Sequence, residues 1–163
     1  MTSNLFERIT SEFPQYRKNL IFEITNLLEL VGMGRIADKL IKHCGLEGDY
    51  KVWAEIKEEL GKIDPYWRLH AMIVPTNDDG SVQIDYGGFR IKNPYAACII
   101  RNRLSKGESE GYFEIYPRFG GEDVPDLSQE YGTRGWLTLE EAVNIAKAAI
   151  SGNYKRLKEA LNK

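Results

Sequence analysis

The apolar residues in the first part of the chain recur at the period of an α-helix. Leu5, Ile9 and Phe13 are spaced four residues apart. Asn4 is expected to cap this helix at its start and Pro14 to end it. Three more helices are predicted with these apolar sides: Leu20, Ile24, Leu27, Leu28 and Val31 between Tyr16 and Val31; Met33, Ile36, Ala37, Leu40 and Ile41 before Gly45; and Trp53, Ile56 and Leu60 between Asp49 and Gly61.

The pattern changes at Lys62-Ile63-Asp64-Pro65, where the period of apolar positions falls to that of a β-strand. A residue before proline is pushed out of the helical region of backbone angles. We therefore divide the chain into a helical part, residues 1–63, and a sheet part, residues 64–163. Both parts are expected to share one core, because a few short helices bury little area alone.

Four strands are predicted beyond this boundary. The turn residues Asn77 to Gly80 indicate a hairpin between the first two strands. The third could also be a short helix. The fourth alternates most clearly, with Phe113 and Ile115 on one face. The predicted strands are Trp67 to Pro75, Val82 to Tyr86, Tyr95 to Leu104 and Tyr112 to Phe119, followed by a long irregular segment from Gly120 to Gly135.

The chain is predicted to end in helices. Thr138 and Glu141 have the spacing of a capping box ahead of an apolar stripe, and Asn153 is expected to cap a last helix. The predicted fold class is therefore α+β. An N-terminal helical group precedes a mostly antiparallel sheet of three to five strands. One or two C-terminal helices pack on the sheet face that carries Phe113 and Ile115.

Composition and charge narrow the possible functions. Apolar residues make up 42% and charged residues 28% of the chain, as in an ordinary globular protein, and the net charge of −2 argues against a whole-molecule field that binds polyanions. Cys44 and Cys98 are expected to be buried free thiols. The first residues do not resemble a signal peptide, and the sequence has no glycosylation sequon or membrane-spanning apolar run. We therefore expect a cytoplasmic protein.

Reactive groups are sparse, which favours a protein that is not an enzyme. The chain has two histidines, and no phosphate loop, metal-ligand cluster or nucleophile motif is evident. We predict no cofactor and no metal site. A small hydrolase or nuclease built around His70, Asp85 and Glu114 is the enzymatic alternative, although Tyr116 stands where a nuclease of this kind would have a lysine.

The most promising surface is the polar side of the predicted strand from Tyr112 to Phe119. Tyr112, Tyr116 and Arg118 should share a face there. Tyrosine and arginine are enriched at binding hot spots. The predicted binding residues are Tyr112, Tyr116 and Arg118, extended by Arg101 and Arg103 on the preceding segment and by an acidic edge at Glu122 and Asp123.

The leading hypothesis from this surface is a binding protein that acts on another protein, as an inhibitor or immunity-type factor. The acidic edge would suit a basic partner, such as a protein that handles nucleic acid. The alternative is a protein that binds single-stranded nucleic acid. The run from Gly111 to Tyr116 resembles the aromatic strand of an RNA-recognition motif, whose rings stack on bases, but Glu110 replaces the basic residue of that motif.

Overall fold

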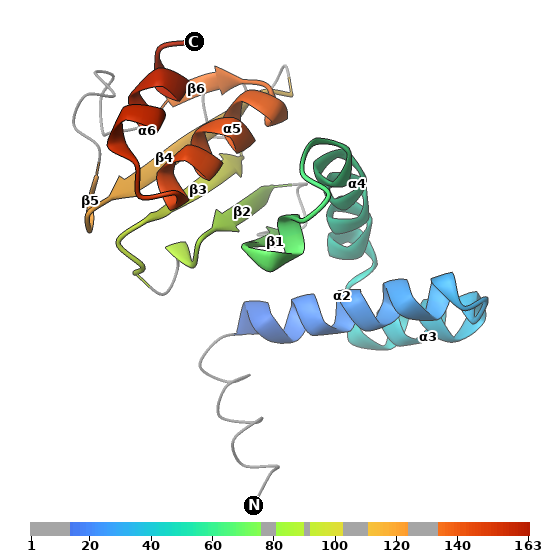
Figure 1. The fold of residues 1–163 in the computed structure, drawn as a ribbon. Coiled ribbons are helices and arrows are strands. Elements are labelled where there is room, and N and C mark those ends of the chain that lie inside the picture. The colour runs from blue at the N-terminus through green and yellow to red at the C-terminus, as the bar shows by residue number, and fades with distance from the viewer. Residues whose placement is uncertain (1–13, 76–80, 90–91, 103–110, 124–133) are drawn as a thin grey trace, which may run out of the picture.

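The computed structural model describes residues 14–75, 81–89, 92–102, 111–123 and 134–163. It confirms the α+β fold class: helices, then an antiparallel sheet, then two helices (Figure 1). The predicted helix around Leu5 to Phe13 lies outside the described residues. The described helices are α2 (Pro14–Leu30), α3 (Gly34–Cys44), α4 (Glu47–Ile63), α5 (Leu139–Ile150) and α6 (Tyr154–Leu161), with a 3-10 turn, η1 (Trp67–Leu69).

The sheet follows the order β1-β2-β3-β4-β5, and β6 also pairs with β4. All the pairs are antiparallel. The segment from Tyr95 to Leu104, for which a strand and a short helix were both open, contains a strand, β3. The strand predicted to start at Trp67 begins later, because η1 occupies its first residues. The strands are β1 (Ala71–Pro75), β2 (Val82–Tyr86), β3 (Ala96–Arg101), β4 (Phe113–Phe119), β5 (Glu122–Asp123) and β6 (Arg134–Leu137).

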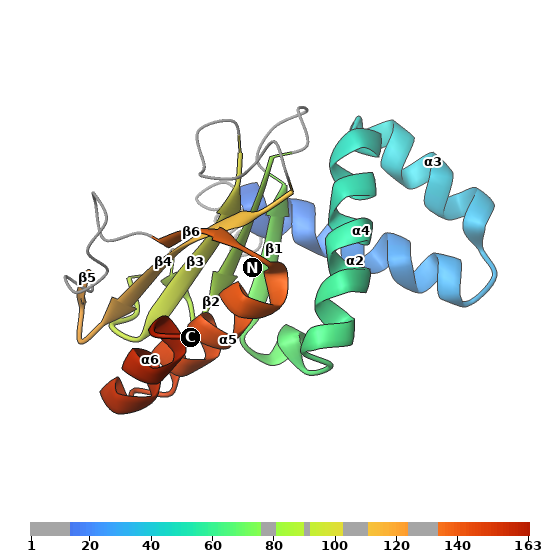
Figure 2. The ribbon, with the colours of Figure 1, turned by 90° about the horizontal axis from the view of Figure 1, so that it is seen from above.

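One face of the sheet is covered by α5, which packs on β2, β3 and β4 (Figures 1 and 2). Ile84, Ile99 and Ile115 are paired in register across these strands and are fully buried. The predicted capping box starts α5: the Thr138 hydroxyl accepts from the Glu141 amide, and the Glu141 carboxylate accepts from the Thr138 amide. The face that carries Ile115 is therefore the helix-covered face, as predicted.

Helix α4 joins the helical part to the sheet. It packs on β1 and on α5, and Trp53, Ile56 and Leu60 are buried as predicted. They belong to the same hydrophobic cluster as the interior of the sheet. The expected stop at Gly61 is wrong, since α4 continues to Ile63, and Asp64 follows it.

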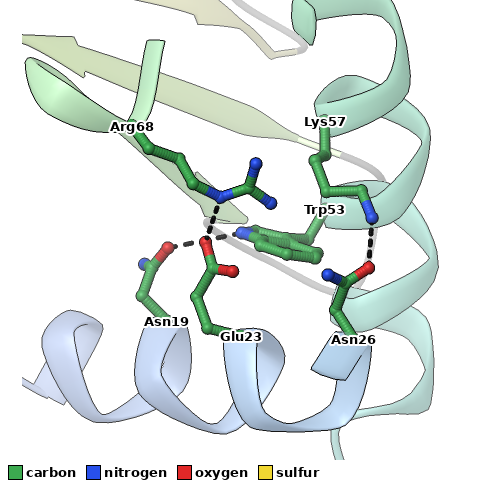
Figure 3. Close-up of polar contacts among 6 residues, drawn as sticks. All are labelled: Asn19, Glu23, Asn26, Trp53, Lys57 and Arg68. Carbon is green, nitrogen blue, oxygen red and sulfur yellow. Dashed lines mark hydrogen bonds and ion pairs between the residues drawn. The ribbon is translucent and has the colours of Figure 1, made fainter. Parts of the chain in front are cut away.

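The orientation of α2 is set by polar contacts. Figure 3 shows three of its side chains turned toward α4 and η1: Asn19 accepts from Trp53 at 3.3 Å, Glu23 accepts from Arg68 at 3.1 Å, and Asn26 accepts from Lys57. Two further contacts lie on the same side, from Lys18 to Asp49 at 2.6 Å and from Tyr50 to Glu29 at 2.8 Å. The side of α2 that faces the protein therefore combines these polar residues with Phe22, whose ring is fully buried against Tyr50 and Trp53.

The apolar stripe predicted for α2 consequently faces outward rather than inward. Leu27 is 58% exposed and Leu30 74% exposed, whereas the polar residues Thr25 and Asn26 are buried. The stripe continues along α3, which packs beside α2. We call the set of large exposed apolar residues on these two helices and their connecting turn the hairpin face: Leu20, Ile24, Leu27, Leu30, Val31, Met33 and Ile36.

Candidate functional site

Tyr116 and Arg118 of the predicted binding residues lie on the side of the sheet away from α5, here called the sheet face. Its centre is a row across three strands, in which Asp85 pairs with Cys98 and Cys98 with Tyr116. The carboxylates of Asp85 and Glu114 are buried, which differs from the solvated face that alternation alone predicts. Buried carboxylates need hydrogen bonds or charge partners, so this is an ordered polar surface rather than a loose, hydrated one.

Tyr116 and Glu114 are coupled on this face. The Tyr116 hydroxyl donates a hydrogen bond to the Glu114 carboxylate. Burial, and then the negative charge of Glu114, raises the pKa of Tyr116 to about 12. Tyr116 is only partly buried, so part of it remains accessible to a partner.

The arginines of the predicted surface are not all brought together. Arg118 lies over the Phe89 ring at 4.3 Å and donates to the Phe89 carbonyl at 3.1 Å. Arg101 pairs in register with Val82 and lies 5.0 Å from the Phe113 ring, so it belongs to the opposite, helix-covered side. Arg103 lies outside the described residues. Glu122 and Asp123 form the short strand β5 against the end of β4.

A residue that sequence reasoning missed lies beside this surface. Trp136, on β6, is 55% exposed, and its ring centroid lies 6.1 Å from that of Tyr112. Its backbone φ is +60°, an angle that bulky residues rarely adopt. The pairing of β6 with β4 is irregular at this point, between Phe113 and Ile115. The only sequence signal was an aromatic residue at the end of a glycine-containing segment.

The enzymatic alternative is not assembled by the fold. The His70 imidazole donates to the Asp64 carboxylate at 2.8 Å, and its ring lies 5.3 Å from that of Tyr86. Tyr86 is part of the interior cluster, whereas Asp85 alternates to the sheet face. His70 is therefore separated by the sheet from Asp85 and Glu114.

The Asp64 carboxylate instead forms a buried polar junction. It lies 3.4 Å from the Tyr86 hydroxyl and 3.9 Å from the Lys147 ammonium group, in addition to its contact with His70. Burial, and then the charge of Asp64, raises the pKa of Tyr86. The junction ties the end of α4 to β2 and α5, which makes a structural role its simplest interpretation.

Among the described residues, no group of three or more His, Cys, Asp and Glu side chains is placed to hold a metal ion. Within the same part of the chain, no helix is both long and apolar enough to cross a membrane. Comparison of the chain with known protein families, curated proteins and solved structures gave no match.

Proposed function

We propose that this chain is a non-enzymatic cytoplasmic binding protein that engages another protein through the sheet face, as an inhibitor or immunity-type factor. The observation that carries the proposal is Trp136. A large aromatic ring is held more than half exposed, on a backbone angle that is unfavourable for it, beside the ring of Tyr112. Neither the exposure of the Trp136 ring nor its backbone angle stabilises the isolated protein.

The backbone angle of Trp136 carries a free-energy cost in the folded protein. A side chain with a Cβ in the left-handed region costs about 1–2 kcal/mol relative to ordinary angles. Such strain collects at ligand clamps and active sites, where the surrounding structure holds it. A partner that covers the ring would remove its exposed aromatic surface from water, which favours binding. Tryptophan and tyrosine are the residues that most often dominate binding in this way.

The charges of the surface favour a protein over single-stranded nucleic acid as its partner. Two carboxylates, Asp85 and Glu114, lie in the middle of the sheet face, where phosphates would be repelled. Arg118 is already engaged by Phe89, and Arg101 is on the other side of the sheet. A basic protein surface suits this arrangement, and the acidic residues of β5 extend it.

The proposal is tested with Trp136→Asn. Asparagine tolerates the left-handed region, so the free energy of unfolding should stay constant or rise by about 1 kcal/mol. We expect partner binding to weaken at least tenfold, roughly the effect of losing a hot-spot aromatic. The partner is found by capture with the full-length chain from nuclease-treated extract, and its affinity for both chains is then measured by calorimetry.

Tyr66→Asn is the matched control, because Tyr66 is an exposed aromatic residue away from the sheet face. It should leave the affinity unchanged. Equal binding by the Trp136 variant and the wild type would remove the sheet face from consideration. Two results would together favour the nucleic-acid alternative. The chain would bind a single-stranded oligonucleotide rather than a protein, and this binding would fall steeply with salt.

A further inference from the structure

We infer that the hairpin face is the interface of a homodimer, in which the α2–α3 pairs of two copies form a four-helix bundle. The inference does not depend on the proposed function, because it rests on a different surface. The residues concerned lie on α2, α3 and the turn between them, which are beside the β1 edge of the sheet and away from β6 (Figures 1 and 2).

The first argument is that α2 leaves its apolar stripe exposed, although Phe22 on its inward side is fully buried in the core. A helix on a globular protein buries its apolar stripe and exposes its polar side. Here Asn19, Glu23 and Asn26 face the protein and are bonded to Trp53, Arg68 and Lys57 (Figure 3). Rotating α2 to bury its apolar stripe would break these contacts. The stripe is therefore held in an outward position, where a second molecule can cover it.

The second argument is the spacing of the stripe. Leu20, Ile24, Leu27 and Val31 are separated by four, three and four residues, which is the alternation of a coiled-coil seam. On α3, Ile36 and Leu40 are four residues apart, and Met33 precedes this helix as its N-cap residue. A homodimer interface pairs the same patch on both subunits, so the stripe of one copy would face the stripe of the other about a two-fold axis.

The third argument is size. Helix α2 has 17 residues and α3 has 11, so they are about 25 Å and about 16 Å long, and with a width of roughly 10 Å each they project over roughly 400 Å². Interdigitated side chains bury more accessible surface than this projection. The projection is about half of the roughly 800 Å² that each partner contributes to a standard interface, so the proposed interface is a small one. The largest apolar patch of a monomer is often a functional surface.

Charge is compatible with a second copy. The stripe positions themselves carry no charge, so no ion would be buried without a partner. The polar residues on the inward side of α2 are bonded within the protein, so they do not compete for the interface. Arg35, Lys39 and Lys42 are exposed on α3, and binding to anionic lipid is therefore an outcome that the test must separate from dimerisation.

The test is the mass of the full-length chain by sedimentation equilibrium across the micromolar range. We expect a dimer, and we expect Ile24→Asp with Leu27→Asp to raise its dissociation constant at least 100-fold. Both positions are substantially exposed, so the circular dichroism and thermal midpoint of the monomer should persist. Leu27→Asn alone is the milder variant, should the doubly charged chain not fold. Leu69→Asp is the control, because Leu69 is 82% exposed but lies outside the hairpin face.

The dimer proposal holds if the hairpin variants dissociate and the Leu69 variant does not. A wild-type chain that stays monomeric throughout overturns it, as does a dimer that the hairpin variants leave intact. A monomer that sediments with anionic lipid vesicles, or that binds only a different protein through Leu27, also overturns it. A dissociated variant that still binds a partner through Trp136 leaves the proposed function standing, so the two ideas fail separately.

Discussion

At the scale of single residues, the buried carboxylate of Asp64 has the clearest energetic consequence. His70 contacts it at 2.8 Å. The sequence around His70 implied an isolated histidine, but the structure gives it this partner. We predict that His70→Ala lowers the free energy of unfolding by about 1–3 kcal/mol, since a buried acceptor loses a partner. Urea unfolding measures this. His43→Ala is the control: His43 is exposed, and its removal should change little.

The same variant bears on the enzymatic alternative. If the chain is a binding protein, His70→Ala and Asp85→Asn should leave the partner affinity of the folded fraction largely intact. Loss of a cellular phenotype in a variant that is fully folded would instead support chemistry at these residues. The stability measurement is needed alongside the phenotype, because unfolding alone would also abolish it.

The tyrosines predict how stability depends on pH at the alkaline end. Tyr116 has a folded pKa of about 12, mainly through burial, against about 10 in an unfolded chain. Below pH 10 both states keep the proton, and the contribution to stability is complete. Between pH 10 and 12 only the unfolded state loses it, so stability falls by at most about 1.4 kcal/mol per pH unit, reduced by solvent screening of this partly exposed ring.

Burial also raises the pKa of Tyr50 and Tyr86, so they act in the same direction. Tyr116→Phe should therefore make the decline shallower without abolishing it. The measurement is urea unfolding at a series of pH values, compared with tyrosinate absorbance. Ionisation of Tyr116 near pH 10 in the folded protein would contradict the expected burial.

At the scale of elements, the sequence predicts what is encoded locally. The strand β4, the hairpin of β1 and β2, and the capping box of α5 are all confirmed. In each case the determining residues are neighbours in the chain: a period of two for strands, and Thr138 with Glu141 for the cap. The fold class follows because these elements occur in the predicted order.

The sequence fails where distant residues decide the outcome. The side of α2 that faces inward depends on Trp53, Lys57 and Arg68, which are all more than 30 positions away in sequence from the α2 residues that they contact. The same applies to the sheet face, where alternation indicated which residues share a side but not that Glu114 would be buried. The positive φ of Trp136 leaves no local signal, because such angles normally favour glycine.

At the scale of the whole molecule, the two surfaces lie apart. The hairpin face is on the β1 side of the sheet, whereas Trp136 is on β6, which pairs with β4 (Figure 1). Dimerisation through the hairpin face would leave the surface around Trp136 free on each copy. A dimer with two binding faces gains avidity for a partner that is itself dimeric or immobilised, because the second contact forms at high effective concentration.

The helical part and the sheet part are expected to fold as one unit. We predict that a fragment from Trp67 to Lys163 does not unfold cooperatively. Removing α4 uncovers β1, where Ile73 is fully buried. It also removes Asp64, which leaves the buried Tyr86 hydroxyl without that acceptor. Differential scanning calorimetry and amide NMR dispersion measure the outcome.

A longer fragment from Glu47 to Lys163 provides the comparison, because it retains α4 and Asp64 but lacks α2 and α3. It should recover a cooperative transition at lower stability, since Trp53 loses its contact with Phe22 at 5.7 Å between ring centroids. A native-like midpoint in the shorter fragment would show that the sheet part is an independent domain. In that event the buried cluster would be a contact between two domains, and the Asp64 junction would stabilise their docking rather than the fold itself.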